Sequence, residues 1–145
     1  MAVDVVTEIV IARPREQVVA YAGDPSHAPQ WYANISSVRW QTPPPVRVGS
    51  RMDFVARFLG RTLAYTYEVV EYSEDRLVMR TAQGPFPMET TYSWVSEGAG
   101  STRMTLRNRG EPAGFAKVTA PVMAMAMRRA NQKDLVRLRR ILESR

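Results

Sequence analysis

Residues 34–110 alternate between apolar and polar side chains with a period of two, and this pattern constrains the fold more than any other feature. In the clearest segment, Met104 and Leu106 would face one side of a strand, and Arg103 and Thr105 the other. One-sided alternation is typical of an antiparallel sheet with one buried and one solvated face. The pattern predicts six strands, at residues 35–41, 51–59, 62–72, 76–82, 86–94 and 102–109.

The two ends of the chain add one further strand and three helices. Residues 3–11 are rich in β-branched residues and predict a strand, and Pro14 then suits the first turn of a short helix. Gly23-Asp24-Pro25 ends that helix and begins a second short one that continues to about residue 31. From residue 115 to 143 the apolar period is helical, although Pro121 interrupts it. The long helix therefore either begins near Thr119, with that residue as its cap, or is kinked at the proline.

This order, β-α-α-β6-α, predicts an α+β fold in which a curved seven-stranded antiparallel sheet wraps around a long C-terminal helix. A helix is only about 10 Å across. A strongly curved sheet of seven strands encloses more volume than one such helix fills. The geometry therefore leaves either a cavity or a layer of large side chains, and composition alone favours filling by side chains.

Composition excludes several classes of site. The chain has no cysteine and one histidine, His27, which excludes a disulfide framework, a thiolate metal site and a histidine-rich metal site. We expect no metal and no cofactor. No stretch approaches the ~20 apolar residues that span a bilayer, and no signal sequence is evident, so a cytoplasmic, non-membrane protein is expected. The net charge is +6, but the arginines are spread over nearly every segment, which argues against nucleic-acid binding.

A series of short segments, in order along the chain, carries a family resemblance. Most are turn and packing residues, so their order and spacing matter more than any one motif. The chain resembles the START-like, polyketide cyclase/dehydrase and lipid-transport superfamily (SRPBCC), whose fold is called helix-grip, over essentially its whole length. The matching segments are 11–14, Val18, Tyr21, 24–25, Trp31, Ile35, Val38, 48–51, 58–61, 67–72, 84–87 and 131–138.

The resemblance implies that residues 1–145 form a single START-like ligand-binding domain with a deep apolar cavity between the sheet and the C-terminal helix. Binding or transport of a small hydrophobic molecule, such as a lipid or a polyketide, is then the expected function. An enzyme of the polyketide cyclase/dehydratase type, acting in the same cavity, is the alternative. The resemblance supplies no catalytic residue. The residues expected to contact the ligand are Phe54, Phe58, Tyr65, Tyr67, Met88, Tyr92, Trp94, Met104, Asn108, Met123 and Met127.

Several polar residues leave alternatives open. Asn108 either binds a polar group of the ligand or lies in water at the end of the sheet, and Asn131 either points to the cavity or caps a backbone group. His27 is expected to be an exposed loop residue rather than an acid or base. Arg57 and Glu68 are expected to form a surface ion pair across neighbouring strands. A third function, an interaction module that uses the basic helix face or a sheet edge, and a homodimer both remain compatible with the sequence.

Overall fold

A computed structural model describes residues 2–115 and 118–145. These ranges contain seven strands, three α-helices and one short 3-10 helix, η1. In chain order the elements are β1 (Val3–Ile11), α1 (Arg15–Ala22), η1 (Pro25–His27), α2 (Ala28–Trp31), β2 (Ile35–Trp40), β3 (Arg51–Phe58), β4 (Arg61–Tyr72), β5 (Arg76–Gln83), β6 (Met88–Ser96), β7 (Thr102–Gly110) and α3 (Ala120–Glu143).

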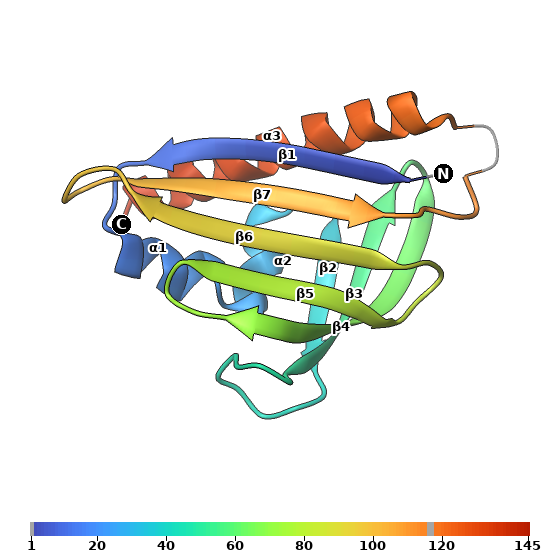
Figure 1. Cartoon of the computed structure of the whole chain (residues 1–145), viewed down its shortest axis with the longest axis horizontal. Coiled ribbons are helices and arrows are strands. Elements are labelled where there is room, and N and C mark those ends of the chain that lie inside the picture. Colours follow the sequence, from blue (N-terminus) through green and yellow to red (C-terminus); the bar gives the residue numbers. More distant parts are fainter. Residues whose placement is uncertain (1, 116–117) are drawn as a thin grey trace.

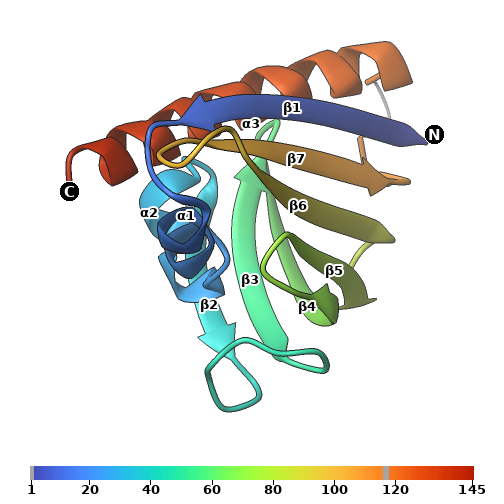
Figure 2. The same cartoon turned by 60° about the vertical axis from the view of Figure 1, so that its left-hand side comes forward.

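The strands form one antiparallel sheet in the order β1-β7-β6-β5-β4-β3-β2, which confirms the predicted helix-grip fold. Strands β2 to β7 pair with their chain neighbours, and β1 pairs with β7 along its whole length. Register shifts interrupt the β2–β3 and β4–β5 ladders, and such irregularities bend strands. The sheet is accordingly strongly curled, with α3 running beside β1 and with α1 and α2 inside the curve (Figures 1 and 2).

The long helix begins at Ala120, with Thr119 as the residue before its first turn and Pro121 within that turn. This selects the first of the two predicted alternatives, because a proline in the first turn sacrifices no helical hydrogen bond. Phe115 lies outside the helix, which corrects the predicted start, and residues 116 and 117 of the predicted helix lie outside the described residues.

Two further predictions about the sheet are wrong. β6 begins at Met88 rather than at residue 86, because Pro87 has no N–H to give to a ladder. Arg57 does not pair with Glu68. The turn at Leu59-Gly60, where both φ angles are positive, pairs Phe58 with Arg61, so Arg57 lies opposite Thr62. Glu68 instead accepts a hydrogen bond of 2.8 Å from the Nε of Arg51.

Buried apolar side chains form two clusters on the concave side of the sheet. The larger one joins the C-terminal half of α3 to α1, α2 and the nearby ends of the strands, and Trp94, Leu135 and Leu138 are fully buried in it. The smaller one lies near the N-terminal end of α3 and includes Met123 and Phe115. The fully buried core is therefore divided into two parts along the length of α3, and the half-buried Tyr65 and Met88 pack against both.

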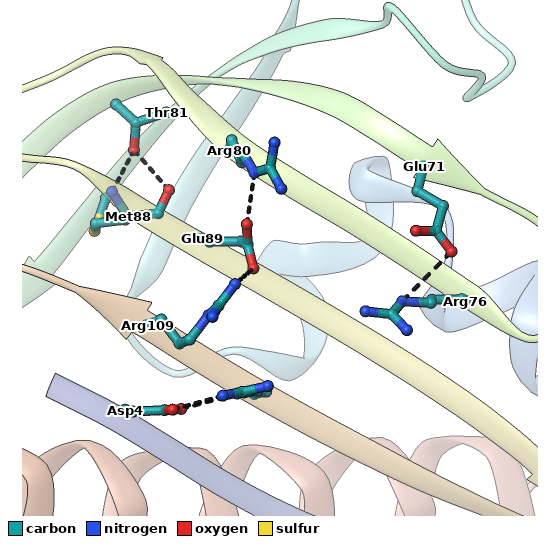
Figure 3. A network of polar contacts seen from close by, with 9 residues as sticks. Asp4, Glu71, Arg76, Arg80, Thr81, Met88, Glu89 and Arg109 are labelled. Atoms are coloured by element: carbon teal, nitrogen blue, oxygen red, sulfur yellow. Dashed lines mark hydrogen bonds and ion pairs between the residues drawn. The ribbon is translucent and has the colours of Figure 1, made fainter.

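The convex face of the sheet carries a network of ion pairs (Figure 3). Asp4 on β1 accepts hydrogen bonds of 2.9 and 2.6 Å from Arg107 on β7, and these bonds lower the pKa of the Asp4 carboxyl. Glu89 on β6 accepts from Arg80 and Arg109 on its two flanking strands. Burial would raise the pKa of Glu89, but these two hydrogen bonds outweigh it and lower the pKa. This face is therefore the solvated one.

We expect the substitution Arg107→Gln to lower the free energy of unfolding only slightly. The pair with Asp4 is exposed, so solvent screens most of its attraction. Urea denaturation at low and high salt measures the effect, which should shrink as salt rises. A large loss of stability that does not depend on salt would mean that this face is covered rather than solvated.

Candidate functional site

A cavity of about 120 Å³ lies between the two apolar clusters. Its wall comes from the concave side of β3, β4 and β6, from the N-terminal half of α3 and from the segments that flank them. Both clusters contribute residues to it, and Tyr65 and Met88 pack against both, so the cavity lies where the two clusters adjoin. Nine of the eleven residues expected to contact a ligand line it: Phe54, Phe58, Tyr65, Tyr67, Met88, Tyr92, Asn108, Met123 and Met127.

The other two expected residues, Trp94 and Met104, do not line the cavity. They lie opposite each other on β6 and β7, both are fully buried, and both belong to the larger cluster. The physical reason is their position along the strands. The concave face is hollow near Met88 and Asn108, but at the other end of β6 it packs on α1, where Trp94 lies beside Gly23.

A chain of hydrogen bonds crosses the floor of the cavity. The Thr90 hydroxyl donates to the Oδ1 of Asn108 at 2.9 Å and lies 2.8 Å from the Tyr67 hydroxyl. Because Thr90 uses its one proton on Asn108, Tyr67 must be the donor to Thr90. The chain uses the oxygen of the Asn108 amide and leaves its nitrogen for another partner. Asn108 is therefore a half-buried wall residue, not one in water at the end of the sheet.

Tyrosine hydroxyls gather at the same wall. Tyr32, which follows α2, and Tyr92 on β6 are hydrogen-bonded to each other at 2.7 Å, and Tyr65 and Tyr67 lie nearby on β4 with ring centroids 5.0 Å apart. Burial raises the pKa of all four hydroxyls, and that of Tyr67 rises to about 12. All four are consequently neutral hydrogen-bonding groups at ordinary pH.

A buried carboxyl lies behind this tyrosine pair. Asp134 on α3 is 3% exposed, and its Oδ1 accepts a hydrogen bond of 3.0 Å from the backbone N–H of Ala33. Burial raises its pKa to about 6, against the opposing effects of that hydrogen bond and of Arg137. The contact ties α3 to the segment that carries Tyr32. Asp134 itself is not part of the cavity wall.

Asn131, one helical turn before Leu135, lies in the cavity wall and has an amide nitrogen without a hydrogen-bond partner among the described residues. It is 6% exposed and lines the cavity. Its amide nitrogen therefore caps no backbone group in the described part of the chain. A buried donor without a partner is costly and needs an explanation.

His27 and Trp31 lie away from the cavity. The Nδ1 of His27 is 2.8 Å from the carbonyl oxygen of Tyr21, and its ring stacks on that tyrosine at 4.3 Å, so it is half-buried rather than a free loop residue. Trp31 is 1% exposed, and its ring packs against the rings of Tyr32 and Tyr92.

Sequence reasoning missed several wall residues, including Tyr32, Thr90 and Phe115. Thr90 could have been found, because it shares the alternating face of Met88 and Tyr92. Tyr32 and Phe115 lie in connecting segments, where no periodicity indicates the direction of a side chain.

Metal-binding clusters and membrane-spanning helices are both absent from residues 2–115 and 118–145. No group of three or more His, Asp or Glu side chains in these ranges is arranged to hold a metal ion. None of the helices there has both the length and the apolar composition that crossing a bilayer requires.

Comparison with known proteins gives a family and a fold. The sequence profile described as "Polyketide cyclase / dehydrase and lipid transport" matches residues 2–143. No curated protein matches the sequence significantly.

Among solved structures, a protein of Thermus thermophilus superimposes with a TM-score of 0.83 at 21% identity, over 97% of each chain. A START superfamily protein of Mycobacterium smegmatis gives 0.84 at 18%, also over 97% of each chain. The Zhui aromatase/cyclase of a Streptomyces species gives 0.80 at 14%, over 99% of this chain and 94% of that one. Because the sequence identities are 21% or lower, this structural similarity establishes the fold alone.

Proposed function

Since the chain belongs to the polyketide cyclase/dehydrase and lipid-transport family, we propose that residues 1–145 act as one domain that binds a small hydrophobic molecule between the sheet and α3. The observation that carries this proposal is the cavity between the two apolar clusters. Tightly packed proteins contain few voids larger than a water molecule. The side chains around a larger void lose van der Waals contacts, and a bound molecule would restore those contacts.

The volume limits the size of the guest. An engineered apolar cavity of about 150 Å³ holds benzene, whereas pockets for drug-sized ligands measure about 300–1,000 Å³. The cavity here, at about 120 Å³, is slightly smaller than the one that holds benzene, so its volume matches a single ring. A short substituent on that ring would require the wall to adapt. Flexible methionines at Met88, Met123 and Met127 would adapt the wall to the shape of such a guest.

The character of the wall supports binding rather than catalysis. Of the described residues that line the cavity, Arg109 alone is charged at neutral pH, and its guanidinium is engaged by Glu89 on the convex face. Cyclase or dehydratase chemistry would need an acid or base that touches the substrate. Asp134 lies behind the wall, and burial makes the four tyrosine hydroxyls of the wall weaker acids than usual. The enzyme alternative therefore has less support than a binding role.

Filling the cavity should abolish binding. We expect the wild-type protein to bind toluene, and an NMR titration measures the dissociation constant. Ala130→Leu should weaken that binding at least tenfold, because the larger side chain occupies the space of the guest. Ala126→Leu is the matched control, since Ala126 is also half-buried on α3 but does not line the cavity. Equal binding by both variants, or none by the wild type, would contradict the proposal.

A further inference from the structure

The cavity wall has more hydrogen-bond donors than it satisfies. The chain from Tyr67 through Thr90 ends on the oxygen of Asn108 and leaves the two amide hydrogens of that residue for another partner. The Tyr32–Tyr92 pair shares one hydrogen bond between two hydroxyls, which leaves one further hydroxyl hydrogen. The Asn131 amide nitrogen is covered by protein and has no partner among the described residues.

Spare hydrogens and spare lone pairs are not equivalent. A carbonyl or hydroxyl oxygen with one lone pair unused is common in proteins, whereas a buried N–H without an acceptor is rare and costly. The wall therefore lacks hydrogen-bond acceptors for its unpaired donors. A guest that brings an oxygen acceptor would satisfy it, and a pure hydrocarbon would not.

The guest should also be uncharged. The four tyrosines of the wall are neutral, because burial raises the pKa of each hydroxyl. The arginine at the rim is already paired with Glu89. A carboxylate would lose its hydration on entry without meeting a countercharge, and an ammonium group would meet donors. A neutral carbonyl oxygen has neither disadvantage.

We infer that the cavity selects a neutral single-ring compound that carries a carbonyl group, and that Asn131 donates a hydrogen bond to the carbonyl oxygen. This inference rests on the proposed function, because it assumes that a ring of this size enters. The last side-chain torsion of asparagine is broad, so the amide can turn toward a guest oxygen within the same wall.

Two probes of nearly equal shape test the inference. Acetophenone carries C=O where α-methylstyrene carries C=CH₂. We expect wild-type protein to bind acetophenone about five- to tenfold more tightly, as one or two net hydrogen bonds would give. In ¹⁵N NMR titrations the side-chain amide resonances of Asn131 should shift with acetophenone and much less with α-methylstyrene. Benzoate should bind at least tenfold more weakly than acetophenone.

Asn131→Leu should abolish or reverse the preference between the two probes while retaining binding of α-methylstyrene. Gln132→Leu is the matched control, since Gln132 is exposed on the same helix, and it should keep the wild-type preference. Tight binding of both probes with equal or reversed preference in the wild type would overturn the inference and leave the proposed function standing. A preference that survives in Asn131→Leu would also overturn it. If neither probe nor toluene binds the wild type, the inference falls together with the proposed function.

Discussion

Leu138→Ala should lower the free energy of unfolding by about 3 kcal/mol, whereas Met127→Ala, three turns earlier on α3, should lower it by about 1 kcal/mol or less. Leu138 is fully buried in the larger apolar cluster, where its removal leaves a void that neighbouring side chains cannot fill. Met127 is half-buried and already faces the cavity, so its truncation removes fewer contacts. Urea denaturation of both variants measures the difference.

The same pair of variants should behave differently in binding. Leu138→Ala should leave the dissociation constant for toluene within about twofold of wild type, provided that the comparison is made where the variant is folded. Met127→Ala changes the cavity wall and should change that constant more. If both substitutions cost the same stability and have the same effect on toluene, the division of the core into a packed end and a hollow end is incorrect.

The sequence predicted the faces of the strands well, because alternation with a period of two depends on the strand itself. Phe54, Tyr67 and Tyr92 face the concave side as expected. Alternation does not say how far along a strand the interior is filled. Trp94 shares a face with Tyr92, yet it contacts the α1 region rather than the cavity, and that depends on where a helix distant in sequence packs.

Register errors have a related cause. The predicted pair of Arg57 and Glu68 cannot form, because the turn at Leu59-Gly60 fixes every pairing along β3 and β4. When one strand is shifted along its neighbour by an even number of residues, the same side chains still face the core. The alternation of apolar and polar residues therefore does not reveal such an error in register. The position and type of the turn were therefore the decisive information.

The role of Asp134 could not be predicted from the helical pattern. On α3 it lies between Asn131 and Leu138, at a spacing compatible with the buried face, but an acidic residue on a helix is usually exposed. Its partner is the backbone N–H of Ala33, 101 residues away. Only the docking of α2 and the following segment against α3 brings the two groups together.

The burial of this carboxyl leads to a prediction about pH. The pKa of Asp134 is about 6 in the folded protein and near 3.8 in the unfolded chain, so the folded state holds the proton more tightly. The stability that this group contributes is present below about pH 4 and is lost as pH rises through about 6. Above that pH the folded state carries a buried carboxylate, at a cost of up to about 3 kcal/mol.

Asp134→Asn should therefore raise the free energy of unfolding by about 1–2 kcal/mol at pH 8. The amide oxygen still accepts from Ala33, but the added NH₂ group needs acceptors, so part of the gain is offset. The difference between variant and wild type should fall toward zero or below as pH falls to 4.5. Taking that difference removes the contribution of other acids, such as Asp4 and Glu89, whose lowered pKa values destabilise both proteins in acid.

Urea denaturation at pH 8, 6 and 4.5 measures this prediction, with Glu111→Gln as an exposed control that should stay within a few tenths of a kcal/mol throughout. The variant should also hold Tyr32 in place, because the hydrogen bond to Ala33 is retained, so its affinity for toluene should match the wild type at every pH. Asp134→Ala breaks that bond and should weaken binding. A wild-type protein that is most stable at pH 8, with Asp134→Asn less stable there, would show that the carboxylate is paired and charged in the folded state, contrary to the burial described here.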